Sequence, residues 1–130
     1  MKSERHKILV ADCHEDMLIV LEKLLEDAGF DTTTVWTASE ALRLIDSYAF
    51  DLFLLNEHLP DAKCEEMLQV LRKRGEPIHC IVMQAREPRT ADCNRFEALG
   101  AKDVVGKHCL TQIVELVRGC LLSNRKRLCA

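Results

Sequence analysis

The feature that most constrains the fold is the regular alternation of short apolar runs with amphipathic stretches. Five such pairs follow one another along the 130 residues. The runs with strand character are 7–11, 30–36, 51–56, 79–83 and 103–106. Helical spacing of apolar residues follows each run, and the last two predicted helices cover 90–99 and 110–122. This order predicts an α/β domain with a doubly wound parallel sheet, whose site lies at the carboxyl ends of the strands.

Local signals agree with this assignment. The run 51–56 is apolar without interruption, as is typical of a parallel strand covered on both faces. Thr37-Ala-Ser-Glu40 has the spacing of a capping box that opens a helix. Gly29 and Gly100 stand where the periodic stretches end, and they predict helix ends. Leu59-Pro60-Asp61 predicts a turn.

The length and net charge of the chain limit the number of domains and the kinds of partner that we expect. A chain of this length predicts one domain, over 1–122, with a short basic tail at 123–130 that we expect to be frayed. The net charge of −3 argues against a domain whose main function is to bind nucleic acid. No apolar run reaches about 18 residues, which argues against a membrane span. The charged residues 1–7 lead into an apolar run too short for a signal peptide, so we expect a cytoplasmic protein.

The cysteines and glycines argue against further classes of protein. Seven cysteines are present, an odd number, and no two form a Cys-x-x-Cys pair, which predicts reduced thiols. With five glycines, the chain has neither a Gly-x-Gly-x-x-Gly fingerprint nor a P-loop. A nucleotide-binding enzyme of either kind is therefore not expected.

Several motifs in sequence order resemble the response-regulator receiver domain, the phosphoacceptor module of two-component signalling. They are Ile8-Leu-Val-Ala-Asp12, Ala28-Gly-Phe30, Ala38-Ser-Glu-Ala-Leu42, Asp51-Leu-Phe-Leu-Leu-Asn56, Leu59-Pro60, Ala98-Leu-Gly-Ala101 with Asp103, and Lys107. The resemblance covers residues 7 to about 122. It implies a flavodoxin-like (βα)5 sandwich with strand order 2-1-3-4-5, and a phosphorelay signalling module that is not an enzyme.

The resemblance also locates a phosphoacceptor site, and most of its positions differ here. Two acids normally follow the first strand, an aspartate takes the phosphoryl group, and a Ser or Thr and a lysine contact it. The corresponding residues are Asp12, Cys13, Asn56, Gln84 and Lys107. His108 replaces the proline that normally follows the lysine, and Val104 stands where receivers carry an aromatic switch residue.

These differences predict a degenerate receiver, or pseudo-receiver. An asparagine amide is neutral and a far poorer nucleophile than a carboxylate. Magnesium prefers hard oxygen ligands, and Asp12 is the one carboxylate left among the three acidic positions. We therefore predict weak or absent magnesium binding, no catalytic residue, and action through a histidine kinase, a phosphotransfer protein, an output domain or a homodimer. Direct contact with nucleic acid or membrane is not expected.

Two alternatives remain open for the retained and unusual residues. Asp12, Asn56 and Lys107 form either a neutral hydrogen-bonded cluster or a structural salt bridge. A thiol or metal sensor is the alternative function, with Asp12 and Cys13 as the weak metal candidates. It rests on soft ligands that the fold would place at one edge of the sheet: Cys13, His14, His58, His108 and Cys109. Such residues are more often solvated loop positions.

Other acids offer a third hypothesis, in which phosphoryl chemistry moves to Asp61 or Glu57. Displacement from the acceptor position counts against it, because in-line attack demands tight positioning. The remaining charged residues are predicted to be solvated faces. They include Glu65-Glu66, Arg86, Arg89 and Arg95.

Overall fold

A central parallel sheet organises the molecule. The computed structural model describes residues 5–75 and 79–129, with side chains described as far as residue 121. The strands of the sheet are β1 (Lys7–Ala11), β2 (Asp31–Val35), β3 (Leu52–Asn56), β6 (Cys80–Gln84) and β7 (Asp103–Gly106). Their order is β2-β1-β3-β6-β7, all parallel. Counted along the chain this is 2-1-3-4-5, so the predicted fold is confirmed.

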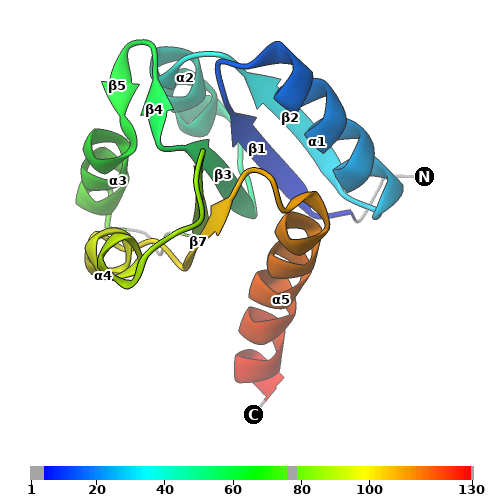
Figure 1. Cartoon of the computed structure of the whole chain (residues 1–130). Helices are drawn as coiled ribbons and strands as arrows, with labels where there is room; N and C mark the ends of the chain where they lie inside the picture. The colour runs from blue at the N-terminus through cyan, green and yellow to red at the C-terminus, as the bar shows by residue number, and fades with distance from the viewer. Residues whose placement is uncertain (1–4, 76–78, 130) are drawn as a thin grey trace.

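Helices cover both faces of the sheet (Figure 1). They are α1 (Glu15–Asp27), α2 (Ala38–Ser47), α3 (Cys64–Lys73), α4 (Thr90–Ala98) and α5 (Leu110–Cys129). α1 and α5 pack on one face, and α2, α3 and α4 pack on the other, so the core is split into two layers. None of the helices in the described ranges combines the length and apolar character that crossing a bilayer requires.

The sequence pattern explains this layering. In β1, Leu9 and Ala11 pack with one layer of the core, whereas Ile8 and Val10 pack with the other. Successive side chains of a strand point to opposite faces, so a strand covered on both sides must be apolar throughout. The start of α2 is also as predicted, because the Thr37 hydroxyl accepts from the Glu40 backbone N–H at 3.1 Å.

Two features differ from the sequence-based expectation. The turn predicted at 59–61 is present, but the short strands β4 (His58–Leu59) and β5 (Ala62–Lys63) on either side of it, which pair as an antiparallel hairpin, were not predicted. The helix predicted to end at residue 122 continues to Cys129, because no glycine or proline follows Gly119 to stop it. The segment predicted as a frayed tail is therefore helical as far as Cys129, and residue 130 lies outside the described residues.

Candidate functional site

The carboxyl ends of four neighbouring strands carry the residues singled out from the sequence. Asp12 follows β1, Asn56 ends β3, Gln84 ends β6 and Lys107 follows β7. Backbone pairing continues past the last of these strands, where the Lys107 N–H donates to the Gln84 carbonyl at 2.7 Å. The sheet thereby fixes the positions of these side chains along one edge.

Asp12 is the centre of the site, and its side chain is fully buried. The Lys107 ammonium lies 2.8 Å from Asp12 Oδ2. The other oxygen, Oδ1, accepts from the His14 backbone N–H at 3.0 Å and lies 2.9 Å from the His14 ring Nδ1. That ring nitrogen is also 3.1 Å from the Lys107 ammonium. Both carboxylate oxygens are thus engaged, which offsets the cost of burying the charge.

Asn56 and Gln84 have other surroundings. Asn56 is buried, and its Nδ2 donates to the His58 carbonyl at 2.8 Å, which holds the start of the β4–β5 hairpin. Among the described contacts, no hydrogen bond or ion pair joins Asn56 to Asp12 or Lys107. Gln84 is fully buried, and its amide lies beside the Asp92 carboxylate and helps to lower the pKa of Asp92. The structure therefore shows a salt bridge flanked by two neutral amides.

The five cysteine and histidine residues that the sequence grouped together fall into three separate places. Cys13 Sγ lies 3.8 Å from His14 Nδ1, next to Asp12. His108 and Cys109 lie beside Glu87, which sequence reasoning had not included. His58 is paired with Glu57, with its Nε2 3.8 Å from Oε1. A single cluster of all five residues is not formed in this structure.

Arg95 connects α4 to the end of β3 and to α3. Its guanidinium lies 3.1 Å from Glu57 Oε2, 3.6 Å from Glu65 Oε2 and 3.5 Å from Asp92 Oδ1. It also lies over the Phe96 ring, 4.5 Å from the ring centre. Arg95 is exposed, as predicted, and Glu65 is partly buried. The sequence did not predict that folding brings these opposite charges from α3, α4 and the end of β3 together.

Asp92 belongs to the same network and is buried. It accepts from the Arg89 backbone N–H at 3.0 Å, and the Arg86 guanidinium lies 2.9 Å away. The backbone hydrogen bond from Arg89 is the main cause that lowers the pKa of Asp92, and the Arg86 charge adds to it. An acid at the third position of a helix is visible in the sequence, whereas the link from Arg95 to Glu57 has no local signature.

The Asp61 carboxylate binds the first turn of α2. It accepts from the backbone N–H groups of Ala38 at 2.8 Å and Ser39 at 2.9 Å, at the start of α2. These bonds, led by the one from Ala38, lower the pKa of Asp61. Glu57 is likewise committed to Arg95. Both acids considered as substitute phosphoacceptors are therefore engaged elsewhere.

The two fully buried cysteines are core residues. Burial raises the pKa of Cys64 to about 12 and raises the pKa of Cys80 well above its ordinary value. Neither thiol therefore offers a reactive thiolate at neutral pH.

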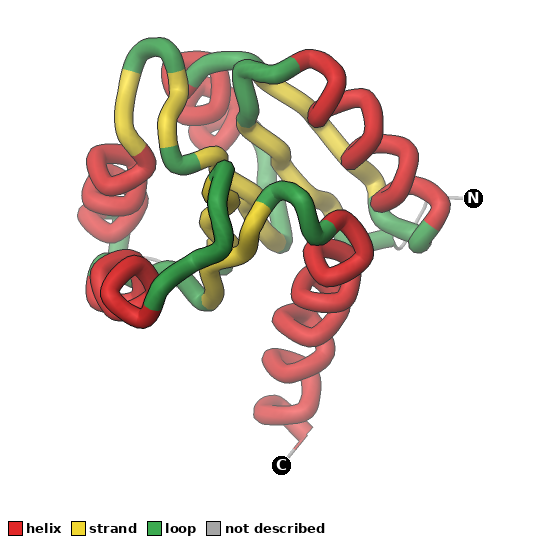
Figure 2. The backbone as a smooth tube through the Cα atoms, viewed as in Figure 1, coloured by secondary structure: helices red, strands yellow, loops and turns green. Residues whose placement is uncertain are grey.

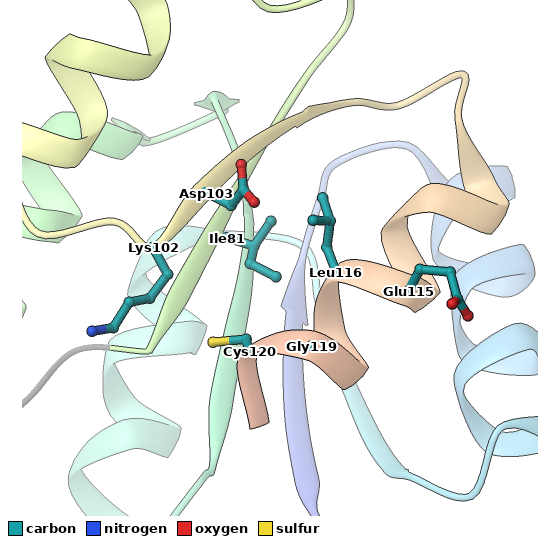
Figure 3. Close-up of a pocket in the computed structure, with 7 residues that line it drawn as sticks. All are labelled: Ile81, Lys102, Asp103, Glu115, Leu116, Gly119 and Cys120. Carbon is teal, nitrogen blue, oxygen red and sulfur yellow. The ribbon is translucent and has the colours of Figure 1, made fainter. Parts of the chain in front are cut away.

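The hollow drawn in Figure 3 lies away from this edge of the sheet. It has a volume of about 260 Å³ and lies between α5 and the amino ends of β6 and β7. Its lining residues are Ile81, Lys102, Asp103, Glu115, Leu116, Gly119 and Cys120. Because Asp12 and Lys107 lie at the carboxyl ends of their strands, this hollow is not part of the candidate site.

Comparison with known families decides the identity of the fold. The family model for the response regulator receiver domain matches residues 8–118. The chain belongs to this family. It is therefore a receiver module of two-component signalling, a class of signalling module rather than a classical enzyme.

Individual relatives of this receiver are distant. It is 33% identical over 108 residues to the DNA-binding response regulator MtrA of Mycolicibacterium smegmatis, covering 82% of this chain and 46% of MtrA. It is 30% identical over 101 residues to the transcriptional regulatory protein TctD of Salmonella typhimurium, covering 78% of this chain and 45% of TctD. The receiver thus spans about half the length of these relatives.

Solved structures show the same fold. The receiver domain of the Francisella response regulator 1452 superposes with a TM-score of 0.86 at 23% identity, covering 92% of this chain and 99% of that one. A CheY-like receiver domain from Methanospirillum hungatei superposes with a TM-score of 0.86 at 22% identity, covering 95% and 99%.

Proposed function

We propose that this receiver does not accept a phosphoryl group by the usual aspartate route and signals through a fixed conformation that binds another protein. The observation that carries the proposal is the Lys107 ammonium on the buried Asp12 carboxylate, 2.8 Å away. Asn56 occupies the acceptor position of the family pattern. Its amide is neutral, so the position lacks the negatively charged oxygen that attack on phosphorus needs.

The residues present do not fit the magnesium ion that the family implies. Both oxygens of Asp12 are engaged by Lys107 and His14. Cys13 replaces the second acid with a soft sulfur ligand, and Asn56 contributes no charge. A magnesium ion would have to displace an ammonium that already supplies the positive charge this pocket requires.

Two contacts around the site support the proposal of a fixed conformation. The salt bridge joins the ends of β1 and β7, while Arg95 joins α4 to Glu57 at the end of β3. Neither link needs a phosphoryl group. The partners that suit such a module are a histidine kinase, a phosphotransfer protein, an output domain or a second copy. Because MtrA is described as DNA-binding and is about twice as long, an output domain is among the partners to test.

Intact mass spectrometry tests the proposal. The receiver is incubated with magnesium and a small acyl-phosphate donor, and circular dichroism verifies that it stays folded. The expected result is an unchanged mass. The matched variant carries Cys13→Asp and Asn56→Asp, which restore both missing acids, and it should gain one phosphoryl group. An adduct on the unmodified chain, mapped to any residue, would overturn the proposal.

Thiol or metal sensing at Cys13 is the second candidate function. The donor atoms of Asp12, Cys13 and His14 lie within 4.8 Å of one another, which favours it. A bound cation would have to move the Lys107 ammonium off Asp12. Cys13→Ser should abolish metal- or oxidant-dependent changes in partner binding if this function operates. Unchanged dependence on metal and oxidant would contradict it.

A further inference from the structure

We propose that Glu87, His108 and Cys109 form a binding site for a divalent cation of the zinc class. One donor atom from each residue lies within 4.8 Å of the other two. They come from two loops, the one between β6 and α4 and the one between β7 and α5. These loops leave neighbouring strands of the sheet (Figure 2). A carboxylate oxygen, an imidazole nitrogen and a thiolate sulfur are the ligand types that zinc combines in proteins.

The distances suit such an ion. Glu87 Oε2 lies 3.3 Å from His108 Nε2. With metal–ligand bonds of about 2.0–2.3 Å, the ligands of a tetrahedral zinc ion stand roughly 3.3–3.8 Å apart. The carboxylate–imidazole pair already has this spacing. Closing the remaining separation requires a movement of about 1 Å, which side-chain rotation in exposed loops supplies.

The backbone holds two of the three ligands in place. A Cβ at Gly106 would lie 2.6 Å from His108 Cε1, so the imidazole packs directly against the glycine backbone. The Cys109 N–H donates to the Gly106 carbonyl, and the Cys109 carbonyl accepts from the Ile113 N–H as the first turn of α5 begins. Gly106 is thus the residue that leaves room for the ring, and Cys109 is fixed as the N-terminal cap of α5.

Charge distinguishes this group from Asp12, Cys13 and His14. The Lys107 ammonium lies 2.8 Å from Asp12 and 3.1 Å from His14, so a cation there meets an existing positive charge. Among the described ion pairs, Glu87 is joined to His108 alone. A carboxylate and a thiolate together balance the two charges of the metal. The second group therefore suits a cation better than the first.

Binding has a defined proton balance. The metal forms a bond to Cys109 Sγ as the thiol proton leaves to solvent, and His108 binds as the neutral imidazole. The fourth position is open to water, because the side chains of Glu87 and His108 are 71% and 55% exposed. The bound cation would connect the two loops that begin after Gln84 and Gly106. Metal occupancy would thereby set the spacing of two loops next to the candidate site.

Titration of the full chain with Co²⁺, followed by displacement with Zn²⁺, tests the site. The expected result is one equivalent of Co²⁺ with the near-ultraviolet absorption of a cobalt–thiolate bond, and its loss on adding Zn²⁺. Cys109→Ser should remove the absorption and keep the fold, because serine is a preferred helix cap. Glu87→Gln should weaken zinc binding by about 10-fold or more in competition with a chromophoric chelator.

Cys13→Ser is the matched control and should leave the absorption and the zinc affinity unchanged. Three results would overturn the site: no cobalt–thiolate absorption in the unmodified chain, retention of that absorption in Cys109→Ser, or its loss in Cys13→Ser. The last result would assign the metal to Asp12, Cys13 and His14.

Discussion

Replacing Lys107 by methionine should destabilise this receiver far more than an ordinary loss of a lysine. Methionine keeps most of the length of the side chain and removes the ammonium. In the folded protein the Asp12 carboxylate is fully buried, and Lys107 is 14% exposed in its side chain. Lys107→Met therefore leaves a buried carboxylate without its charge partner, while the rest of the sheet edge keeps its packing.

The structure allows the magnitude to be estimated. Removing one partner of a buried ion pair costs about 3–5 kcal/mol. Asp12 keeps the hydrogen bond from the His14 backbone N–H at 3.0 Å. We therefore expect a loss of stability at the lower end of this range, about 3 kcal/mol. With a urea m-value of about 1.5 kcal/mol/M, the unfolding midpoint should fall by about 2 M. This is a large fraction of the roughly 5–15 kcal/mol that stabilises a domain.

Urea unfolding at pH 7, followed by far-ultraviolet circular dichroism, measures the effect. The double variant Asp12→Asn with Lys107→Met removes both charges and should recover most of the lost stability. Lys102→Met, at an exposed lysine, is the matched control and should change the free energy of unfolding by less than about 0.5 kcal/mol. If Lys107→Met is as stable as this control, or if the double variant is no more stable than Lys107→Met, the reasoning is refuted.

Three further predictions concern other contacts of the site's surroundings. Asp61→Ala should lower the free energy of unfolding by about 1 kcal/mol, because the Ala38 and Ser39 N–H groups at the start of α2 lose their acceptor while the Thr37 cap remains. The pKa of Asp61 is lowered in the folded protein, so the stabilisation by its carboxylate is complete above the ordinary pKa of 3.8. This stabilisation is lost as the pH falls through the lowered pKa of the folded state. Urea unfolding at pH values from 7 to 3 measures the change. Arg95→Ala breaks the ion pair with Glu57 and should lower the free energy of unfolding by roughly 0.5–1 kcal/mol at low salt. The loss should be smaller in about 1 M NaCl, because salt screens the ion pair, and unfolding at both salt concentrations measures the difference. Gly106→Ala should push the His108 ring aside and weaken zinc binding by about 10-fold, measured by chelator competition, with an unchanged circular dichroism spectrum.

Most of the fold is predictable from the sequence because its signals are local. The uninterrupted apolar run that became β3 requires a sheet covered on both faces. Gly29 and Gly100 have φ values of 102° and 109°, in the left-handed region that favours glycine. The ends of the helices before them could therefore be predicted from single residues. The length of α5 was not predictable, because no residue in its last turns specifies a stop.

The sequence by itself determined the order of strands and helices and the family resemblance, and it places Cys13 after the first strand and Asn56 at the end of the third. Tertiary structure alone decided which charged groups meet. His14 and Lys107 are 93 residues apart in sequence and lie 3.1 Å apart in space, since parallel pairing brings the ends of β1 and β7 to the same edge. The link from Arg95 to Glu57 arises in the same way. Periodicity and capping act over a few residues, whereas these pairs depend on strand order and register.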